Sequence, residues 1–204
     1  MGAMRSEAVL LRPARADDAR AIAALALLAG GGIPEVAWAG QAEPGETLLD
    51  VGERRMRRDE GTFSYRTVTI AEVAGAIVGM MLAYPLGETT KEAIAEAETY
   101  PDFVRPLVLL ELEAPHSVYI NMLAVAPERQ GQGIGSLLLR HAEAMARRAG
   151  CPEVSLEVFS DNARAEALYR RQGYVRRAER ATVPHPGCRY GDRVFLLVRA
   201  VPPA

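Results

Sequence analysis

The sequence has no excess of positive charge, few cysteines and no long apolar run. Its 24 Lys and Arg residues are balanced by 26 Asp and Glu residues. A dedicated nucleic-acid-binding protein is usually strongly basic, so we expect no nucleic-acid partner. The two cysteines, Cys151 and Cys188, lie outside any Cys-x-x-Cys motif, which argues against a zinc site or a disulfide framework and fits a reducing cytoplasm. The longest uncharged apolar run, residues 73–84, is too short to cross a bilayer as a helix, so we expect no membrane association.

The sequence also has no linker rich in Gly, Pro or Ser, no internal repeat and no low-complexity tract. Residues 1–13 contain no signal-peptide hydrophobic region, and the first few are consistent with a cloning remnant. With 204 residues, 49% of them hydrophobic and 25% charged, the chain is long enough to bury a sizeable core. We therefore predict a single cytoplasmic domain over residues 1–204.

Hydrophobic periodicity predicts an order of strands and helices in which one β-α-β-α unit is combined with hairpins. Asp17 is the predicted N-cap of the first helix, and Gly52 weakens the prediction of the second. The acidic segment 88–117 is expected to form one or two short helices between strands. Strands are predicted over 8–14, 65–73, 76–84, 118–125, 153–159, 174–183 and 192–200, and helices over 17–29, 46–60, 133–150 and 163–173. This order favours an α/β or α+β layer around a mixed sheet.

A glycine-rich loop, "PERQGQGIG" at residues 127–135, precedes the strongest predicted helix. Each glycine costs roughly 1 kcal/mol of helix stability relative to alanine. The first N–H groups of a helix have no internal partners, and the helix dipole favours negative charge at that end. The loop is therefore a candidate site for a phosphate or pyrophosphate.

Other interpretations of this loop are weaker. A Walker loop requires Gly-Lys-Ser/Thr, and the loop contains no lysine. A dinucleotide fingerprint requires Gly-x-Gly-x-x-Gly close behind a strand, whereas this loop has Gly-x-Gly-x-Gly behind Pro127, although Glu157 lies at about the expected distance. A flexible helix start without a ligand remains the plainest alternative.

A second motif changes this assessment. The loop contains Gln-x-x-Gly-x-Gly at 130–135, and 27 residues after Gly135 the chain continues with Asn-x-x-Ala-x-x-Leu-Tyr-x-x-x-Gly-Tyr at 162–174. Together, with a helix and a strand between them, the two motifs resemble the GCN5-related N-acetyltransferase (GNAT) family. The resemblance is strongest over residues 118–175, and residues 11–22 resemble the opening of the family.

The resemblance implies the GNAT fold, a mixed and mostly antiparallel sheet flanked by helices. It makes 88–117 a helical insert between strands 3 and 4. It also implies an acetyl-CoA-dependent N-acetyltransferase, in which a primary amine attacks acetyl-CoA directly in a ternary complex. The alternative is a CoA-binding module without activity, which would not need a proton donor at the sulfur.

The resemblance places the acetyl-CoA pyrophosphate on backbone N–H groups between Gln130 and Ser136, and the pantetheine arm on the strand before the loop. Asn162 is a cofactor contact, the N-cap of the following helix, or both. No metal is expected. The implied cofactor-binding residues are Leu123, Ala124, Val125, Arg129, Gln130, Gly131, Gln132, Gly133, Ile134, Gly135, Ser136, Asn162 and Tyr169.

Two residues carry the implied chemistry. Tyr169 resembles the general acid that protonates the departing CoA thiolate, and a phenol with a pKa near 10 is protonated at pH 7. Glu157 resembles the general base of the family's protein-N-terminal branch, acting through a water because a carboxylate is a weak base unless burial raises its pKa. The alternatives are a core tyrosine and a solvent-facing or salt-bridged glutamate. Glu113, Tyr119 and Asn121 are further candidates to line the acceptor side.

The acceptor is a small-molecule or peptide amine that the sequence does not identify. The acids of the segment 88–117 suggest a wall that favours a cationic amine, with a solvated acidic face as the alternative. These acids are Glu88, Glu92, Glu96, Glu98, Asp102, Glu111 and Glu113, against Lys91 and Arg105. A homodimer through the C-terminal strands is implied by the resemblance alone.

Overall fold

The computed structural model describes residues 8–202, so the predictions for the first residues of the chain lie outside the described part. Within these residues, seven strands form one sheet in the order β1-β2-β3-β4-β5-β7-β6. Among the strand pairs of this described part, only β4–β5 is parallel. The strands are β1 (Val9–Pro13), β2 (Val68–Val73), β3 (Ala76–Pro85), β4 (Ser117–Val125), β5 (Glu153–Phe159), β6 (Val175–Ala181) and β7 (Arg193–Ala200). The predicted mixed, mostly antiparallel sheet is confirmed.

Seven α-helices flank this sheet within the described residues. They are α1 (Ala19–Ala29), α2 (Ile33–Ala39), α3 (Leu48–Met56), α4 (Lys91–Ala97), α5 (Arg105–Glu111), α6 (Ile134–Ala149) and α7 (Ala163–Arg171). Helix α2 was not predicted, because it has only seven residues and follows a run of glycines that indicates a helix end. The predicted cap at Asp17 is wrong: a short 3-10 turn, Ala16–Asp18, precedes α1, and the Asp18 carboxylate accepts the N–H of Arg15 at 2.7 Å.

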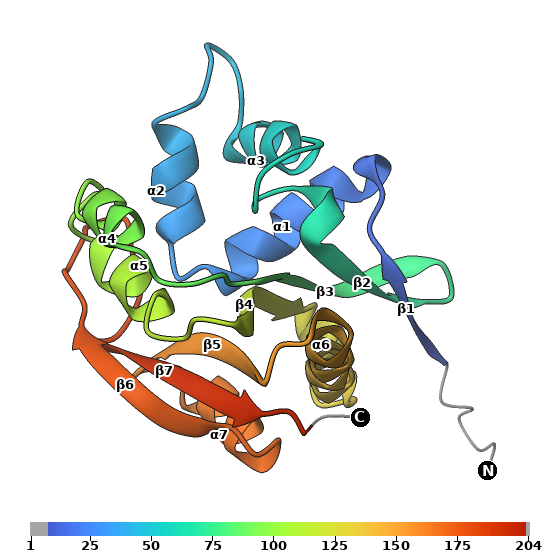
Figure 1. The fold of residues 1–204 in the computed structure, drawn as a ribbon. Coiled ribbons are helices and arrows are strands. Elements are labelled where there is room, and N and C mark those ends of the chain that lie inside the picture. The colour runs from blue at the N-terminus through green and yellow to red at the C-terminus, as the bar shows by residue number, and fades with distance from the viewer. Residues whose placement is uncertain (1–7, 203–204) are drawn as a thin grey trace.

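The helices form layers on both faces of the sheet. Figure 1 shows α1, α2 and α3 on one side and α6 and α7 on the other. Strand β3 is buried on both faces, as predicted: Met81 and Ala83 belong to the core under α6, and Met80 and Leu82 to the core under α1. A third, smaller core lies between α5 and β7, on the face opposite α6. Packed side chains therefore hold the central strands in place from both faces.

Gly52 has a packing reason for its place in α3. An added Cβ atom would lie 2.4 Å from the ring of Trp38 and 2.8 Å from the Cβ of Ala23. Glycine therefore lets α3 pack directly against α2 and α1, and this packing outweighs the low helix propensity that weakened the prediction.

Strands β4 and β5 separate partway along their length. Their parallel pairing runs from Ser117 opposite Glu153 to Ile120 opposite Leu156 and then ends, while β4 continues to Val125 paired with β3 alone. The register between β3 and β4 shifts at this point, leaving Asn121 as the extra residue of a β-bulge. The divergence opens a gap at the centre of the sheet, lined on one side by backbone groups that no neighbouring strand uses.

Candidate functional site

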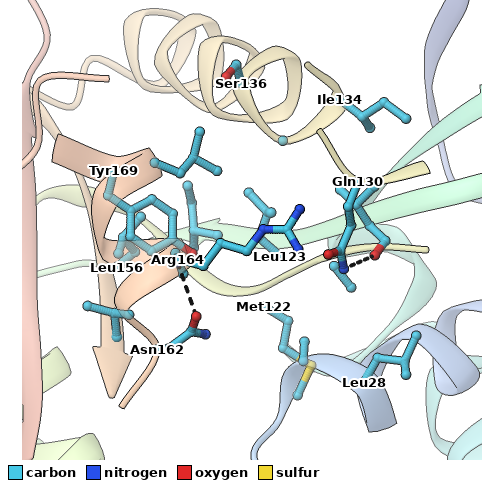
Figure 2. A pocket seen from close by; sticks show the side chains of 18 of the residues that line it. Leu28, Met122, Leu123, Gln130, Ile134, Ser136, Leu156, Asn162, Arg164 and Tyr169 are labelled. Atoms are coloured by element: carbon cyan, nitrogen blue, oxygen red, sulfur yellow. Dashed lines mark hydrogen bonds between the residues drawn. The ribbon is translucent and has the colours of Figure 1, made fainter. Parts of the chain in front are cut away.

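A cavity of about 530 Å³ lies in the gap between β4 and β5. The second half of β4, the start of α6, the end of β5 and α7 form its walls, and the end of α1 reaches its mouth (Figure 2). The site thus combines a strand edge, a helix N-terminus and the residues of a second helix. All three come from the segment 117–174, in which the two sequence motifs lie.

The glycine loop holds the start of α6 open towards the cavity. Gly131 and Gly133 adopt left-handed backbone conformations, with φ of 79° and 85°, that residues other than glycine rarely adopt. Gly133 is the N-cap of α6 and no side chain caps the helix, so its first N–H groups are available to a ligand. The Gln130 side chain donates to the carbonyl of Val125 at 3.1 Å and joins the loop to the end of β4. This is the geometry of an anion site.

The structure brings the predicted cofactor-binding residues together, with one exception. Gln132 does not line the cavity, and its side-chain amide donates to the carbonyl of Glu128 at 3.2 Å. The others line it: Leu123, Ala124, Val125, Arg129, Gln130, Gly131, Gly133, Ile134, Gly135, Ser136, Asn162 and Tyr169. The third glycine of the loop, Gly135, serves packing, because an added Cβ atom would lie 3.1 Å from a methyl group of Leu168 on α7.

Tyr169 lies on α7 where that helix faces the cavity. The residue is 8% exposed, and its ring packs at 5.9 Å from the ring of Tyr174. Burial raises the pKa of the Tyr169 phenol to about 12, and its hydroxyl makes no hydrogen bond within the described residues. The hydroxyl is therefore protonated at neutral pH and free to donate to a group in the cavity.

Asn162 combines the two interpretations that the sequence left open. It is the N-cap of α7, where its Oδ1 atom accepts the N–H of Ala165 at 3.1 Å, and it also lines the cavity (Figure 2). The capping role is thus present, and the same side chain orients the helix that carries Tyr169.

The carboxylate of Glu157 on β5 has no hydrogen-bond partner. The residue is partly exposed, but both carboxylate oxygens are buried and accept no hydrogen bond. Burial raises the pKa of Glu157 well above its ordinary value and the charge of Glu111 raises it further, while Arg180 opposes the rise. The alternative of a solvent-facing or salt-bridged glutamate is therefore wrong. Burial of this kind favours the neutral form of the carboxyl group over the charged form.

A second carboxylate, that of Glu111, is partly buried on the face of the sheet opposite α6. The Tyr84 hydroxyl donates to Oε1 of Glu111 at 3.2 Å, and the Asn121 side-chain amide donates to the Tyr84 oxygen at 3.4 Å. The ring of Tyr119 meets the ring of Tyr84 edge-on at 5.8 Å. Burial raises the pKa of Glu111 to about 7. Tyr119 and Asn121 were predicted near the acceptor side; Tyr84 was not, and Glu111 was only one acid among seven.

None of the acids of the segment 88–117 lines the cavity. Glu98 and Asp102 pair with Arg105, and Glu113 pairs with Arg180 at 2.8 Å. Three further acids, Glu88, Glu92 and Glu96, are exposed. The hypothesis of an acidic wall thus reduces to Glu111, the acid of this group that α5 holds against the sheet.

Sequence reasoning missed other residues of the cavity. Figure 2 shows Arg164 reaching from α7 across the cavity towards Leu123, and Leu28 and Met122 lie at the opposite wall. Arg164 occupies an unspecified position of the second motif, so the motif contained no signal for it. Leu28 is 60% exposed at the end of α1, where an apolar side chain without a core partner is the signal that could have identified it.

Residues 8–202 contain no group of three or more His, Cys, Asp or Glu side chains arranged to hold a metal ion. Among the helices described, none has the length and apolar character required to traverse a bilayer.

The sequence model of the Acetyltransferase (GNAT) family matches residues 36–174. Streptothricin acetyltransferase of Streptomyces lavendulae is 46% identical over 56 residues, which is 28% of this chain and 30% of that protein. N-alpha-acetyltransferase MAK3 of Arabidopsis thaliana is 43% identical over 58 residues, again 28% of this chain and 30% of that protein. The match thus spans less than a third of these relatives. The mosquito arylalkylamine N-acetyltransferase like 5b has a similar fold, with a TM-score of 0.66 and 19% identity, over 95% of this chain and all of that one.

Proposed function

The chain belongs to the acetyltransferase (GNAT) family, and on this premise we propose that it is an N-acetyltransferase that transfers an acetyl group from acetyl-CoA to a primary amine. The observation that carries the proposal is the cavity between β4 and β5, where an uncapped helix start, an unpaired strand edge and a buried phenol meet. We also infer a single domain, because one sheet contains strands from both ends of the chain.

The residues of the cavity fit acetyl-CoA. The loop at Gly131 and Gly133 leaves open space where a Cβ atom would stand, so phosphates can approach the backbone N–H groups of the first turn of α6. The free edge of β4 between Leu123 and Val125 offers N–H and C=O groups to the amides of the pantetheine arm. When bound, acetyl-CoA supplies an acyl group activated as a thioester.

Tyr169 is the proposed general acid. Its phenol stays protonated at neutral pH because its pKa is about 12, and it lines the cavity without an internal hydrogen bond. It would donate this proton to the thiolate that leaves when the C–S bond breaks.

Glu157 is the proposed general base. Its raised pKa makes the carboxylate a stronger base than an exposed glutamate. Approach of a cationic amine would favour the charged form of this carboxylate. The amine, once neutral, would attack the thioester directly, and the proton that its nitrogen loses as the amide forms would restore the proton that Tyr169 gives to the thiolate. Neither Cys151 nor Cys188 lines the cavity, where it could form an acyl intermediate.

Release of free CoA from acetyl-CoA in the presence of a panel of amines tests the proposal. We expect amine-dependent release, and a kcat about 100-fold lower in Tyr169→Phe with little change in the affinity for acetyl-CoA. Tyr174→Phe is the matched control, because Tyr174 is a buried neighbour whose hydroxyl has no partner and which does not line the cavity. A thermal shift with acetyl-CoA but no release with any amine would indicate a binding module instead.

A further inference from the structure

The position of the Tyr169 hydroxyl depends on how helix α7 is held. The hydroxyl makes no hydrogen bond within the described residues, so no neighbouring group fixes its direction. Asn162 caps the N-terminal end of the helix, and Tyr169 lies in its last turn. The residue that holds the C-terminal end of α7 therefore sets where this hydroxyl lies in the cavity.

Arg199 on β7 holds that end. Its guanidinium donates to the carbonyl of Gln172, the C-cap of α7. The last carbonyls of a helix have no partner inside the helix, and a cation beside them also suits the negative end of the helix dipole. Gly173 follows with a left-handed φ of 83°, and a Cβ atom added there would lie 3.8 Å from Nε of Arg199. The arginine side chain therefore packs against the turn that ends α7.

The same guanidinium reaches helix α6. Its Nη1 atom lies 2.8 Å from Oε1 of Glu143, and this contact is an ion pair, because Oε1 accepts no hydrogen bond of regular geometry from the described residues. Glu143 is buried in the middle of α6, and a buried carboxylate needs a cation nearby. Arg147, one turn further along α6, lies 4.0 Å from the other oxygen. Arg199 is thus the closest cation to Glu143 and joins α6 to α7.

Tyr174 links this ion pair to Tyr169 by packing. The charges of Glu143 and Arg199 both act on the Tyr174 phenol, which therefore lies close to them. The Tyr174 ring is 2% exposed and lies 5.9 Å from the Tyr169 ring, and the Tyr174 N–H donates to the Tyr169 carbonyl at 3.0 Å. A shift of the ion pair would therefore move the ring on which Tyr169 rests.

Resting on the proposed N-acetyltransferase activity, we propose that Arg199 is a positioning residue. It ties α7, which carries the proposed general acid, to α6, whose start is the proposed phosphate site. The tie holds the Tyr169 hydroxyl at a fixed place relative to the bound cofactor. Arg199 does not line the cavity, so it acts through Tyr169 and exchanges no proton itself.

The first test follows Tyr169 without any turnover. Protein labelled with 13C at the tyrosine Cζ atom is titrated with CoA, and the Tyr169 resonance is identified by its loss in Tyr169→Phe. We expect CoA to shift this resonance in the parent chain, and to shift it less than half as far in Arg199→Gln. Calorimetry should give a CoA affinity within threefold of the parent. An equal shift in both proteins, or a larger loss of affinity, would overturn the proposal.

A double-mutant cycle then tests the reaction. Release of CoA from acetyl-CoA is measured with the amine of the panel that gives the fastest release. We expect Arg199→Gln to lower kcat about tenfold in the parent chain and less than twofold in Tyr169→Phe, with little change in the KM for acetyl-CoA. A tenfold loss in Tyr169→Phe as well would show that Arg199 acts by another route.

Two further variants separate positioning from folding. Arg199→Lys keeps a positive charge for Glu143 and a donor for the Gln172 carbonyl, so we expect it to recover most of the kcat. Glu143→Gln leaves no unpaired charge on α6 but removes the attraction that orients the guanidinium, so we expect a severalfold fall in kcat. Parent-like kcat in Glu143→Gln, or no recovery in Arg199→Lys, would contradict the proposed bridge.

Arg177→Gln is the matched control. Arg177 donates to Glu153 at 2.6 Å, so this variant also breaks a partly buried Arg–Glu pair of the sheet, but one that joins β6 to β5. We expect its kcat to equal that of the parent, and an equal loss in Arg177→Gln and Arg199→Gln would overturn the proposal. Failure of the proposed function looks different: the Tyr169 resonance would still respond to Arg199→Gln, but no amine would cause release of CoA.

Discussion

Two glycines at opposite ends of α6 adopt the same left-handed backbone conformation in different surroundings. Gly133, with φ of 85°, starts the helix beside the cavity, and Gly150, with φ of 68°, ends it away from the cavity. An added Cβ atom meets no other atom at either position. Changing either residue to alanine therefore costs about 1 kcal/mol of folding free energy through backbone strain. We predict that only Gly133→Ala also weakens acetyl-CoA binding, by tenfold or more.

Urea unfolding and calorimetric titration with acetyl-CoA measure the two effects separately. Gly150→Ala is the matched control, since it has the same strain without contact with the ligand. A similar affinity for acetyl-CoA in both variants would contradict the proposal that the start of α6 holds the phosphates.

At the residue scale, two motifs singled out side chains that the structure brings together. The glycine loop and Tyr169, which the resemblance to the GNAT family pointed to, line one cavity, and their roles stay predictions. Glu111 could not be singled out, because its sequence context resembles that of Glu96 and Glu113. Its burial comes from the packing of α5 against β7, a contact between distant parts of the chain.

At the scale of elements, α7 depends on one capping side chain. Asn162 accepts the N–H of Ala165, and α7 has only nine residues, so the cap contributes a large part of the helix's own stability. We predict that Asn162→Ala lowers the free energy of unfolding by about 1 kcal/mol and lowers kcat, because Tyr169 lies on this helix. Asn162→Asp keeps the capping oxygen and should retain the stability.

Chemical denaturation and the CoA-release assay measure these changes. If Asn162→Ala were as stable as the parent chain, the cap would be dispensable. If Asn162→Asp kept the stability but lost the affinity for acetyl-CoA, the added negative charge in the cavity would be the cause.

Element-scale predictions succeeded where periodicity extends over a whole strand or a long helix. The hairpin of β2 and β3, the strand β5 and the helix α6 lie close to their predicted limits. Helix α2 was missed because it is short and is held by a tertiary contact, the packing of Trp38 against Gly52. Such a helix has little signal of its own.

At the scale of the whole molecule, the buried carboxyl groups make stability depend on pH. The pKa of Glu111 is raised from 4.5 to about 7, and that of Glu157 is raised as well, both mainly by burial. A raised carboxyl pKa means that the folded state binds the proton more tightly than the unfolded state. The contribution is therefore complete below about pH 4.5 and is lost as the pH rises through 7.

We predict that the free energy of unfolding of the ligand-free protein falls between pH 5 and pH 8. The loss from Glu111 is up to about 3 kcal/mol, since one unit of pKa corresponds to about 1.4 kcal/mol. Glu111→Gln should flatten this dependence, and Glu96→Gln should not. Urea unfolding at several pH values measures the dependence of the free energy of unfolding on pH. If this dependence were the same in Glu111→Gln, folding would not raise the pKa of the Glu111 carboxyl group.

Some properties of this protein follow from the sequence alone, because they depend on residues close together in the chain. These properties are the strands and long helices, the glycine loop that leaves the start of α6 uncapped, and the tyrosine at a fixed distance behind it. The homodimer through the C-terminal strands, which only the family resemblance implies, stays a prediction.

Only the tertiary structure decided the rest. It placed β7 between β5 and β6, ended the pairing of β4 with β5 after Ile120 to open the cavity, and buried Glu111 near Glu157. Each of these outcomes depends on which distant surfaces exclude water together. Burial of this kind sets the pKa of a carboxyl group, and no local pattern encodes it.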